Sequence, residues 1–294
     1  MPNLDKPLVQ WTLLIFLAFI WGSSFILMKK GLTSFSWDQV ASLRIIISAI
    51  FLSPLLLRNF KQIKKNQWWR ILIAGLLGSG IPAYLFPLAQ TQISSSLTGM
   101  LNSLVPLFTV VIGLLFFNLA FRWMKMLGVV LGLIGALGLV FSSGNQNFNE
   151  GNLAYASLVI LATIMYATNI NFIKTFLAEV GAINITSFGF LFTAPIAAAH
   201  LFSTNFIEVL TTDETATLNL FYISLLAIFG TAIAVILFNM LIKKVSAVFS
   251  SSVTYIIPVF AIFWGLIDGE NIQLMQFICV GIILIGIYIV NKDN

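Results

Sequence analysis

The sequence predicts an all-α membrane protein with ten transmembrane helices, and three observations support this prediction. Of the 294 residues, 59% are hydrophobic and only 9% are charged, whereas soluble domains contain about 25% charged residues. The apolar residues form ten runs of roughly 20, the length that crosses a hydrocarbon core as a helix. Basic residues concentrate in alternate loops. The composition excludes a soluble domain, because a water-soluble surface needs more polar cover.

The predicted spans follow one another through short loops. They comprise residues 9–30, 37–57, 70–90, 94–117, 123–141, 152–173, 181–203, 217–241, 245–267 and 272–291. A link such as QTQISS, between the third and fourth spans, is so short that consecutive helices must be antiparallel neighbours. This favours one compact bundle. Cys279 is the single cysteine, so no internal disulfide forms.

The charges predict the orientation in the cell inner (plasma) membrane. If the N-terminus is inside, the inner segments hold twelve of the fifteen lysines and arginines, and the outer segments hold most of the acids. Cytoplasmic loops carry such an excess, so both termini are expected in the cytoplasm. The same distribution argues against nucleic acid as a partner. Arg44, inside the second span, is expected to snorkel outward or to pair with an outer acid.

The chain also contains an internal repeat. A shift of 152 residues gives nine identities over 37 positions. The identities include Gly78 with Gly230, Ser94 with Ser246 and Pro106 with Pro258. A second shift of 145 aligns Trp21 with Tyr166, Ser24 with Asn169 and Lys29 with Lys174. We therefore predict two five-helix repeats, residues 1–145 and 146–294, in opposite orientations because five is odd. Many secondary transporters build two gates around one central site in this way.

Two helices carry an aromatic residue one turn from a polar one. Trp21 and Ser24 share a face of the first helix, and Tyr166 and Asn169 share a face of the sixth. Such a face suits a pocket for a partly aromatic or amphipathic solute. The alternative is ordinary helix packing, but the symmetric positions favour the pocket.

Further polar side chains complete the predicted substrate site. The additional candidates are Tyr84, Asn102, Asn239 and Tyr255. The asparagines should point inward, because an amide without a partner is costly in hydrocarbon. They either bind the solute or join helices. No acid lies at mid-helix depth, so the cavity is expected to carry no fixed charge and to bind a neutral or zwitterionic solute.

Four residues are candidates for gating. Pro106 and Pro258 each free a carbonyl and bend a helix, which suits a gate, although such kinks are also common in membrane helices. Lys29 and Lys174 end their helices on opposite sides, where they either snorkel or line the two mouths. Glycines of the fifth and tenth helices predict a scaffold pair or a dimer contact, so the protein is a monomer or a homodimer.

An enzyme is not expected, nor is a cofactor or metal. The chain has one histidine, one cysteine and no H-E-x-x-H motif, so an intramembrane hydrolase or metal centre lacks its residues. A channel or a non-transporting membrane receptor stays possible. Saturable flux stimulated by counter-substrate separates a carrier from both.

Three stretches resemble the EamA family of the drug/metabolite transporter superfamily: WGSSFILMKKGL, SLVPLFTVVIGLLFF and TYIIPVFAIFWGLIDGE. The resemblance covers the chain as two EamA-like halves. It implies ten helices with cytoplasmic termini and a central cavity, with the fifth and tenth helices peripheral. It also implies export of small metabolites, amino acids and aromatic ones included, by alternating access. Tyr166 and Asn169 replace a tryptophan-alanine pair of many relatives, so a different metabolite or drug is the alternative cargo.

Overall fold

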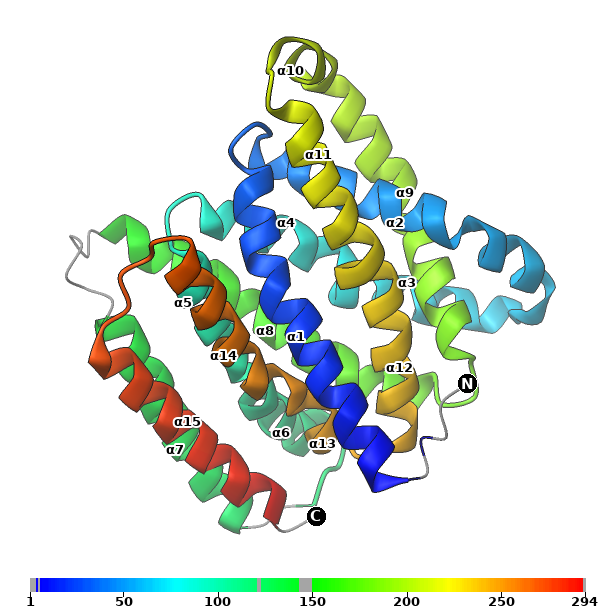
Figure 1. Cartoon of the computed structure of the whole chain (residues 1–294). Coiled ribbons are helices and arrows are strands. Elements are labelled where there is room, and N and C mark those ends of the chain that lie inside the picture. Colours follow the sequence, from blue (N-terminus) through cyan, green and yellow to red (C-terminus); the bar gives the residue numbers. More distant parts are fainter. Residues whose placement is uncertain (1–3, 5, 121–122, 143–149, 293–294) are drawn as a thin grey trace.

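The described part of the protein is helical throughout. A computed structural model describes residues 4, 6–120, 123–142 and 150–292, and these residues form helices and no strand (Figure 1). Eight helical segments within this part are long and apolar enough to cross a membrane. Helices suit lipid because each backbone group finds its partner inside the segment. The prediction of an all-α, multi-span membrane protein is confirmed.

The helices follow one another with few long connections. In the first half of the chain they are α1 (Pro7–Gly31), α2 (Trp37–Asn59), η1 (Phe60–Gln62), η2 (Lys65–Gln67), α3 (Trp68–Gly75), η3 (Leu76–Gly80), α4 (Ile81–Gln90), α5 (Ser95–Leu101), η4 (Asn102–Leu104), α6 (Val105–Phe116) and α7 (Trp123–Ser142). In the second half they are α8 (Glu150–Phe176), α9 (Ala182–Ser203), α10 (Phe206–Thr212), α11 (Ala216–Leu225), η5 (Leu226–Ile233), α12 (Ala234–Lys244), α13 (Ala247–Ser251), α14 (Val253–Ile267) and α15 (Leu274–Lys292).

Four of the eight spans change their winding part-way. The span Lys65–Gln90 contains the π-helical turn η3, and the span Ala216–Lys244 contains the π-helical turn η5. The other two break at η4 and at a turn before α14. Pro82 explains η3 in part: it has no N–H to give to the carbonyl four residues back, and the N–H of Ile81 bonds to the Leu76 carbonyl instead.

Pro106 and Pro258 lie where the sequence predicted bends. Pro106 occupies the first turn of α6, directly after the 3₁₀ turn η4. A proline is tolerated in a first turn because that N–H needs no helical partner. Pro258 lies inside α14. The predicted fourth span is thus two helices joined by a tighter turn.

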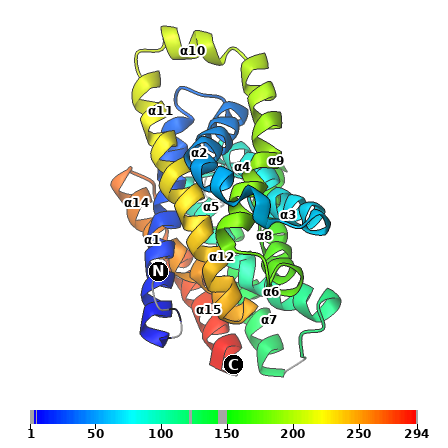
Figure 2. The same cartoon turned by 90° about the vertical axis from the view of Figure 1, so that its right-hand side faces the viewer.

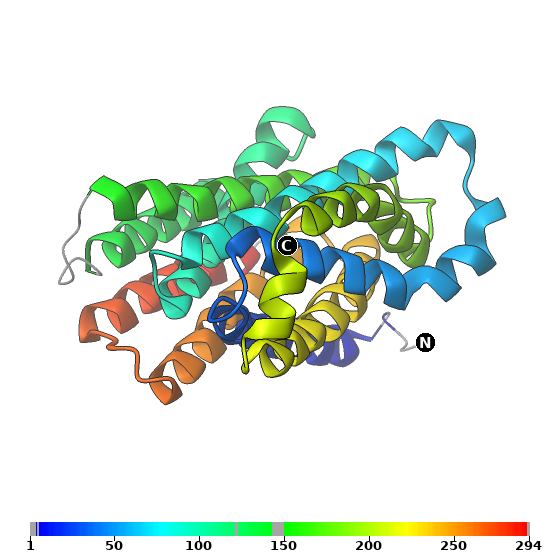
Figure 3. The ribbon, with the colours of Figure 1, turned by 90° about the horizontal axis from the view of Figure 1, so that it is seen from above.

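Helices α7 and α15 form a pair at one side of the bundle, opposite α2 and α3 (Figures 1 and 3). Glycines let the two backbones approach closely. A Cβ atom on Gly135 would lie 2.8 Å from the Cys279 carbonyl oxygen, and one on Gly286 would lie 2.6 Å from that of Gly128. The predicted small-residue faces thus pack against each other within one chain. The apolar stretches Met126–Gly135 and Leu274–Gly286 are shorter than the eight spans, so ten spans stays a prediction.

The short helix α10 was not predicted. It connects α9 to α11 and lies at one end of the molecule (Figure 2). Its seven residues are too few to show a periodicity, and only Phe206 is buried, in contact with Phe35 at 5.9 Å between ring centroids. Sequence reasoning therefore treated this segment as a loop.

The bundle has two ends, which we name after two lysines. The Lys29 end holds the last turn of α1 and the starts of α2, α5 and α15, whereas the Lys174 end holds the last turns of α8 and α12. The first turn of α1 and the last turn of α15 lie together at the Lys174 end (Figures 1 and 2). The two terminal helices thus place their outermost turns on the same side of the bundle.

The α7–α15 contact yields a test of the packing. The Gly286→Val variant should lower the thermal midpoint of the detergent-purified protein, because its side chain meets the backbone of Gly128 and Gly132. Overpacking of this kind costs about 1–3 kcal/mol. The matched control is Gly281→Val on the same helix, where a Cβ atom meets nothing within 4 Å. Equal midpoints for the two variants would contradict the close pairing.

Candidate solute-binding cavity

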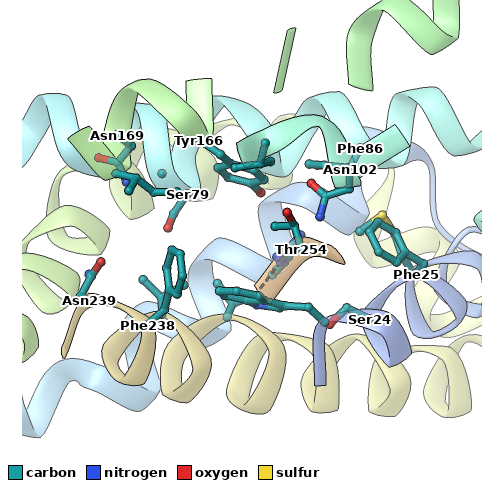
Figure 4. Close-up of a pocket in the computed structure, with 18 residues that line it drawn as sticks. Ser24, Phe25, Ser79, Phe86, Asn102, Tyr166, Asn169, Phe238, Asn239 and Thr254 are labelled. Atoms are coloured by element: carbon teal, nitrogen blue, oxygen red, sulfur yellow. Dashed lines mark hydrogen bonds between the residues drawn. The ribbon is translucent and has the colours of Figure 1, made fainter. Parts of the chain in front are cut away.

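A central cavity of about 90 Å³ lies between the spans. Its lining comes from α1, α2, η3, α4, η4, α6, α8, η5, α12 and α14. One buried water needs roughly 10–15 Å³, so the space fits several waters or a small metabolite. Figure 4 shows two facing rows of side chains. One row holds Asn169, Tyr166, Ser79, Phe86 and Asn102, and the other holds Asn239, Phe238, Thr254, Ser24 and Phe25.

Three of the four irregular turns line this cavity, and the fourth lies close to a lining residue in the chain. The turn η3 contributes Gly78 and Ser79, η4 contributes Asn102, η5 contributes Thr231, and the turn before α14 leads into Thr254. Irregular backbone at membrane depth is tolerated where it is buried in protein or lines a polar cavity. The breaks in the helices and the cavity therefore belong to one feature.

Aromatic pairs build both walls. The Trp21 ring meets Phe238 edge-on at 4.9 Å, and its Nε1 donates a hydrogen bond of 2.8 Å to the Gly230 carbonyl. Tyr166 stacks on Phe86 with centroids 5.8 Å apart. Rings in these arrangements attract each other beyond simple area burial. The two predicted aromatic residues line the cavity, each supported by a phenylalanine that sequence reasoning did not select.

Positions related by the two sequence shifts make matching contacts. Trp21 and Tyr166 are 145 apart, and their partners Phe238 and Phe86 are 152 apart. The same shifts relate the approach of Ser24 to Gly230 and that of Asn169 to Gly78. Asn102 and Thr254, which both line the cavity, are also 152 apart. The two halves of the chain thus contribute equivalent positions to the cavity.

The polar lining groups differ in how well they are satisfied. Asn239 donates to Thr186 Oγ1 at 3.0 Å, and Ser24 donates to the Ile20 carbonyl at 2.8 Å. By contrast, the Oδ1 atoms of Asn102 and Asn169 are buried and have no hydrogen-bond donor among the described residues. Buried polar atoms usually have a partner, so these two oxygens are exceptions among the residues that line the cavity.

Arg44 corrects two expectations. It is only 9% exposed and lines the cavity, where its Nε donates to Thr231 Oγ1 at 2.6 Å. No carboxylate of the described residues forms an ion pair with it. The predictions that Arg44 snorkels outward or pairs with an outer acid, and that the cavity has no fixed charge, are wrong. Ser48 donates to the Ala227 carbonyl at 2.9 Å, and this contact between α2 and η5 turns the Arg44 face inward.

Two predicted site residues lie outside the cavity. The Tyr84 hydroxyl is 3.0 Å from Ser42 Oγ, and its ring contacts Trp37 and His200. Tyr255 is buried but is not among the lining residues, whereas its neighbour Thr254 is. One residue along a helix rotates the side chain by about 100°, so the choice between neighbours depends on a rotation that sequence does not fix.

Lys29 belongs to an ion-pair cluster at its end of the bundle. Its Nζ lies 2.6 Å from Asp268 Oδ2 and 2.9 Å from Glu270 Oε1, while Lys30 pairs with Asp268 at 2.6 Å. Glu270 also accepts hydrogen bonds at the start of α5, from the Ser95 and Ser96 backbone N–H groups and the Ser95 hydroxyl. The cluster therefore ties α1 and α5 to the loop between α14 and α15.

The electrostatics of this cluster favour ionised carboxylates. Burial alone would raise the pKa of Glu270, but hydrogen bonds from Ser96, Lys29 and Ser95 outweigh it and hold that pKa below its usual value. The pKa of Asp268 is lowered in the same way: burial opposes ionisation, and the bonds from Lys29 and Lys30 overcome it. Both carboxylates thus stay charged at neutral pH and hold the cluster together.

Lys174 makes a different kind of contact. Its Nζ donates to the backbone carbonyls of Lys243 and Val245, at 3.3 and 2.7 Å. These carbonyls lie where α12 ends, so the lysine joins α8 to the connection between α12 and α13. An ammonium near a helix C-terminus is favourable because unpaired carbonyls gather there. Neither Lys29 nor Lys174 lines the cavity itself.

The spans and the solute-sized cavity they enclose are typical of membrane solute transporters. The model of the EamA-like transporter family matches the chain twice, over residues 10–141 and 153–292. The chain therefore belongs to the EamA-like transporter family. It is a multi-pass transporter of the inner membrane.

Several relatives match nearly the whole chain. The uncharacterized inner membrane transporter YedA of Escherichia coli K12 is 27% identical, over 92% of this chain and 87% of its own. An uncharacterized transporter of Archaeoglobus fulgidus is 25% identical over 97% and 99%. The S-adenosylmethionine/S-adenosylhomocysteine transporter of Chlamydia muridarum is 25% identical over 96% and 91%. One crystal structure shares the fold, with a TM-score of 0.67 at 16% identity over 96% of each chain.

The lowered carboxylate pKa values yield a pH prediction. A carboxylate whose pKa is lower in the folded state stabilises the protein at any pH above its pKa in the unfolded state, which is about 4. This stabilisation is lost as the pH falls through the pKa of the folded state. Glu270→Gln should therefore reduce the free energy of unfolding at pH 7 by about 1–2 kcal/mol, which lowers the thermal midpoint. The difference from the parent should shrink below about pH 4.

The control for this prediction is Glu214→Gln, which changes an exposed side chain. It should leave the midpoint unchanged across the same pH range. If the difference between parent and Glu270→Gln persists undiminished at pH 3, the Glu270 carboxylate does not act through its charge.

Proposed function

We propose that this protein is a secondary transporter that exports small metabolites, amino acids in particular, by alternating access. The observation that carries the proposal is the central cavity, whose walls consist of equivalent positions from both halves of the chain. A carrier of this kind exposes one site to either side of the membrane in turn. A cavity that binds its solute through partners from both halves suits that mechanism.

The proposal includes the two repeats and their orientation. Residues 1–145 and 146–294 act as two five-helix halves of opposite orientation, with both termini in the cytoplasm. Matching contacts at shifts of 145 and 152 support the repeats. The excess of basic residues in the loops of the Lys174 end supports the orientation. The Lys29 end then faces outward.

Four residues are proposed as parts of two gates. The ion pairs of Lys29 hold the outer mouth closed, and the bonds of Lys174 to backbone carbonyls hold the inner mouth. Pro106 and Pro258 are the proposed bending points of the fourth and ninth spans. Because Pro106 follows η4, which contributes Asn102 to the cavity, a bend there couples the mouth to the site.

The proposed site consists of Trp21 and Tyr166 as aromatic walls with Ser24, Asn102, Asn169 and Asn239 as polar partners. Tyr84 and Tyr255 take no direct part in solute contact. The S-adenosylmethionine transporter among the relatives supports an amino-acid-like cargo, since S-adenosylmethionine carries an α-amino-acid group. The glycine faces of α7 and α15 pair within one chain, which supports a single chain as the transporting unit.

The site is tested by uptake of labelled amino acids into proteoliposomes that contain the purified full-length protein. Trp21→Ala and Asn102→Ala should each raise the half-saturation concentration, by about tenfold for a loss of about 1.4 kcal/mol. Trp11→Ala is the matched control on α1, because Trp11 is 49% exposed and lies outside the cavity. Uptake by both site variants equal to the parent at low substrate would reject the assignment. Flux that does not saturate would indicate a channel.

The gates and the orientation are tested together by thiol labelling in intact cells. A Ser79→Cys probe in the cavity, on a Cys279→Ala background, reports access from outside. Glu270→Gln should increase labelling by an impermeant reagent because it releases Lys29, whereas Lys174→Gln should decrease it. If Lys174→Gln alone increases labelling, the orientation is reversed. If both variants shift labelling in the same direction, the two-gate proposal is wrong.

A further inference from the structure

Arg44 is a cation inside the bundle without an anion beside it. It is nine-tenths buried, and within the described part of the chain its side chain makes one hydrogen bond, from Nε to Thr231 Oγ1. Among the described residues that line the cavity, it is the single charged one. A buried charge without a partner is strongly unfavourable. The guanidinium therefore needs water or an anion in the cavity as a partner for its charge.

The same cavity holds two acceptors without donors. Asn102 is 5% exposed and its Oδ1 has no partner, and the Oδ1 of Asn169 is in the same state. Figure 4 places both on one wall, on either side of Tyr166. An amide oxygen accepts hydrogen bonds and gives none. These oxygens therefore need N–H or O–H donors, while the Arg44 guanidinium needs an anion as its partner.

We propose that Arg44 anchors the carboxylate of the transported solute and that the amide oxygens of Asn102 and Asn169 accept from its amino group. This inference rests on the proposed function and specifies its cargo as small amino carboxylates. A guanidinium suits a carboxylate, because its planar fork makes two parallel, charge-assisted hydrogen bonds. The aromatic rings of Trp21 and Tyr166 then contact the remainder of the solute.

The arrangement also predicts which solutes are rejected. An amine without a carboxylate brings a second positive charge beside Arg44. A neutral solute leaves the guanidinium without a counter-charge. A carboxylate without an amino group satisfies Arg44 but leaves the two amide oxygens unpartnered. Only a molecule with both groups satisfies all three sites.

Three probes of matched shape separate these cases: phenylalanine, 3-phenylpropionate and 2-phenylethylamine. Each is added at rising concentration to the purified full-length protein, and the thermal midpoint reports binding. In the parent, phenylalanine should bind most tightly, 3-phenylpropionate about tenfold more weakly, and 2-phenylethylamine most weakly. In Arg44→Gln the preference for carboxylates should disappear, and Arg44→Lys should retain part of it. Arg58→Gln, an exposed cation at the end of α2, should behave as the parent.

A second readout needs no ligand. Arg44→Gln removes an unpaired buried charge and keeps a donor for Thr231, so its ligand-free midpoint should equal or exceed that of the parent. Equal shifts by the three probes in the parent, absence of any shift included, would overturn the assignment. So would carboxylate protection that survives in Arg44→Gln.

The result is distinguishable from failure of the proposed function. Carboxylate protection that depends on Arg44, without transport of any amino acid, supports the anchor and rejects amino-acid transport. Transport of phenylalanine that is equal in the parent and Arg44→Gln does the opposite: it supports the proposed function and rejects the anchor.

Discussion

Hydrocarbon offers no hydrogen bonds to a polypeptide backbone, and this constraint organises the structure. Regular helix satisfies each backbone group within its own span. The turns η3, η4 and η5 interrupt three of the spans and contribute residues to the cavity, where side chains supply some of the missing partners. The indole of Trp21 donates to the Gly230 carbonyl in η5, and the Thr231 hydroxyl donates to the Leu226 carbonyl. The cavity and the broken helices therefore depend on each other.

At each end of the bundle a lysine side chain joins its own helix to another segment of the chain, but its partners differ between the ends. At the Lys29 end, ion pairs and bonds from N–H groups at the start of α5 converge on Glu270. The position 152 residues earlier is Asn118, which is uncharged, and Lys174 binds neutral carbonyls instead. Both lysines donate charge-assisted hydrogen bonds, but only Lys29 is also attracted by carboxylates of opposite charge. Lys29 thus makes ion pairs and Lys174 binds backbone carbonyls, so only the contact at the Lys29 end depends on the ionisation of carboxylates.

The sequence alone was sufficient to predict the eight long spans of the described residues and several residues that line the cavity. Length and hydropathy identify a helix in lipid, and the spacing of Trp21 and Ser24 places both on one face. The two shifts then relate that face to Tyr166 and Asn169. Rotation of a helix about its own axis is harder to predict when both of its faces are apolar. For that reason Arg44 was expected to face outward and Tyr84 inward, whereas the contacts of α2 with η5 and of α4 with α9 determine the opposite. Phe86 and Phe238 are identical in the 152-residue shift, and that match is the signal that would have selected them.

A transporter must release what it binds, and the unsatisfied groups of this cavity suit that requirement. In the proposed site, water hydrates the Arg44 guanidinium when no solute is bound. Solute binding then exchanges one set of hydrogen bonds for another, so the net gain of each is only about 0.5–3 kcal/mol. A few such bonds and two aromatic contacts favour binding, and the entropy lost on binding opposes it. The expected binding free energy is about −8 to −4 kcal/mol, which corresponds to dissociation constants in the micromolar to millimolar range. Selectivity arises because a solute that lacks one group leaves a buried charge or oxygen without a partner, and that penalty separates solutes of the same size.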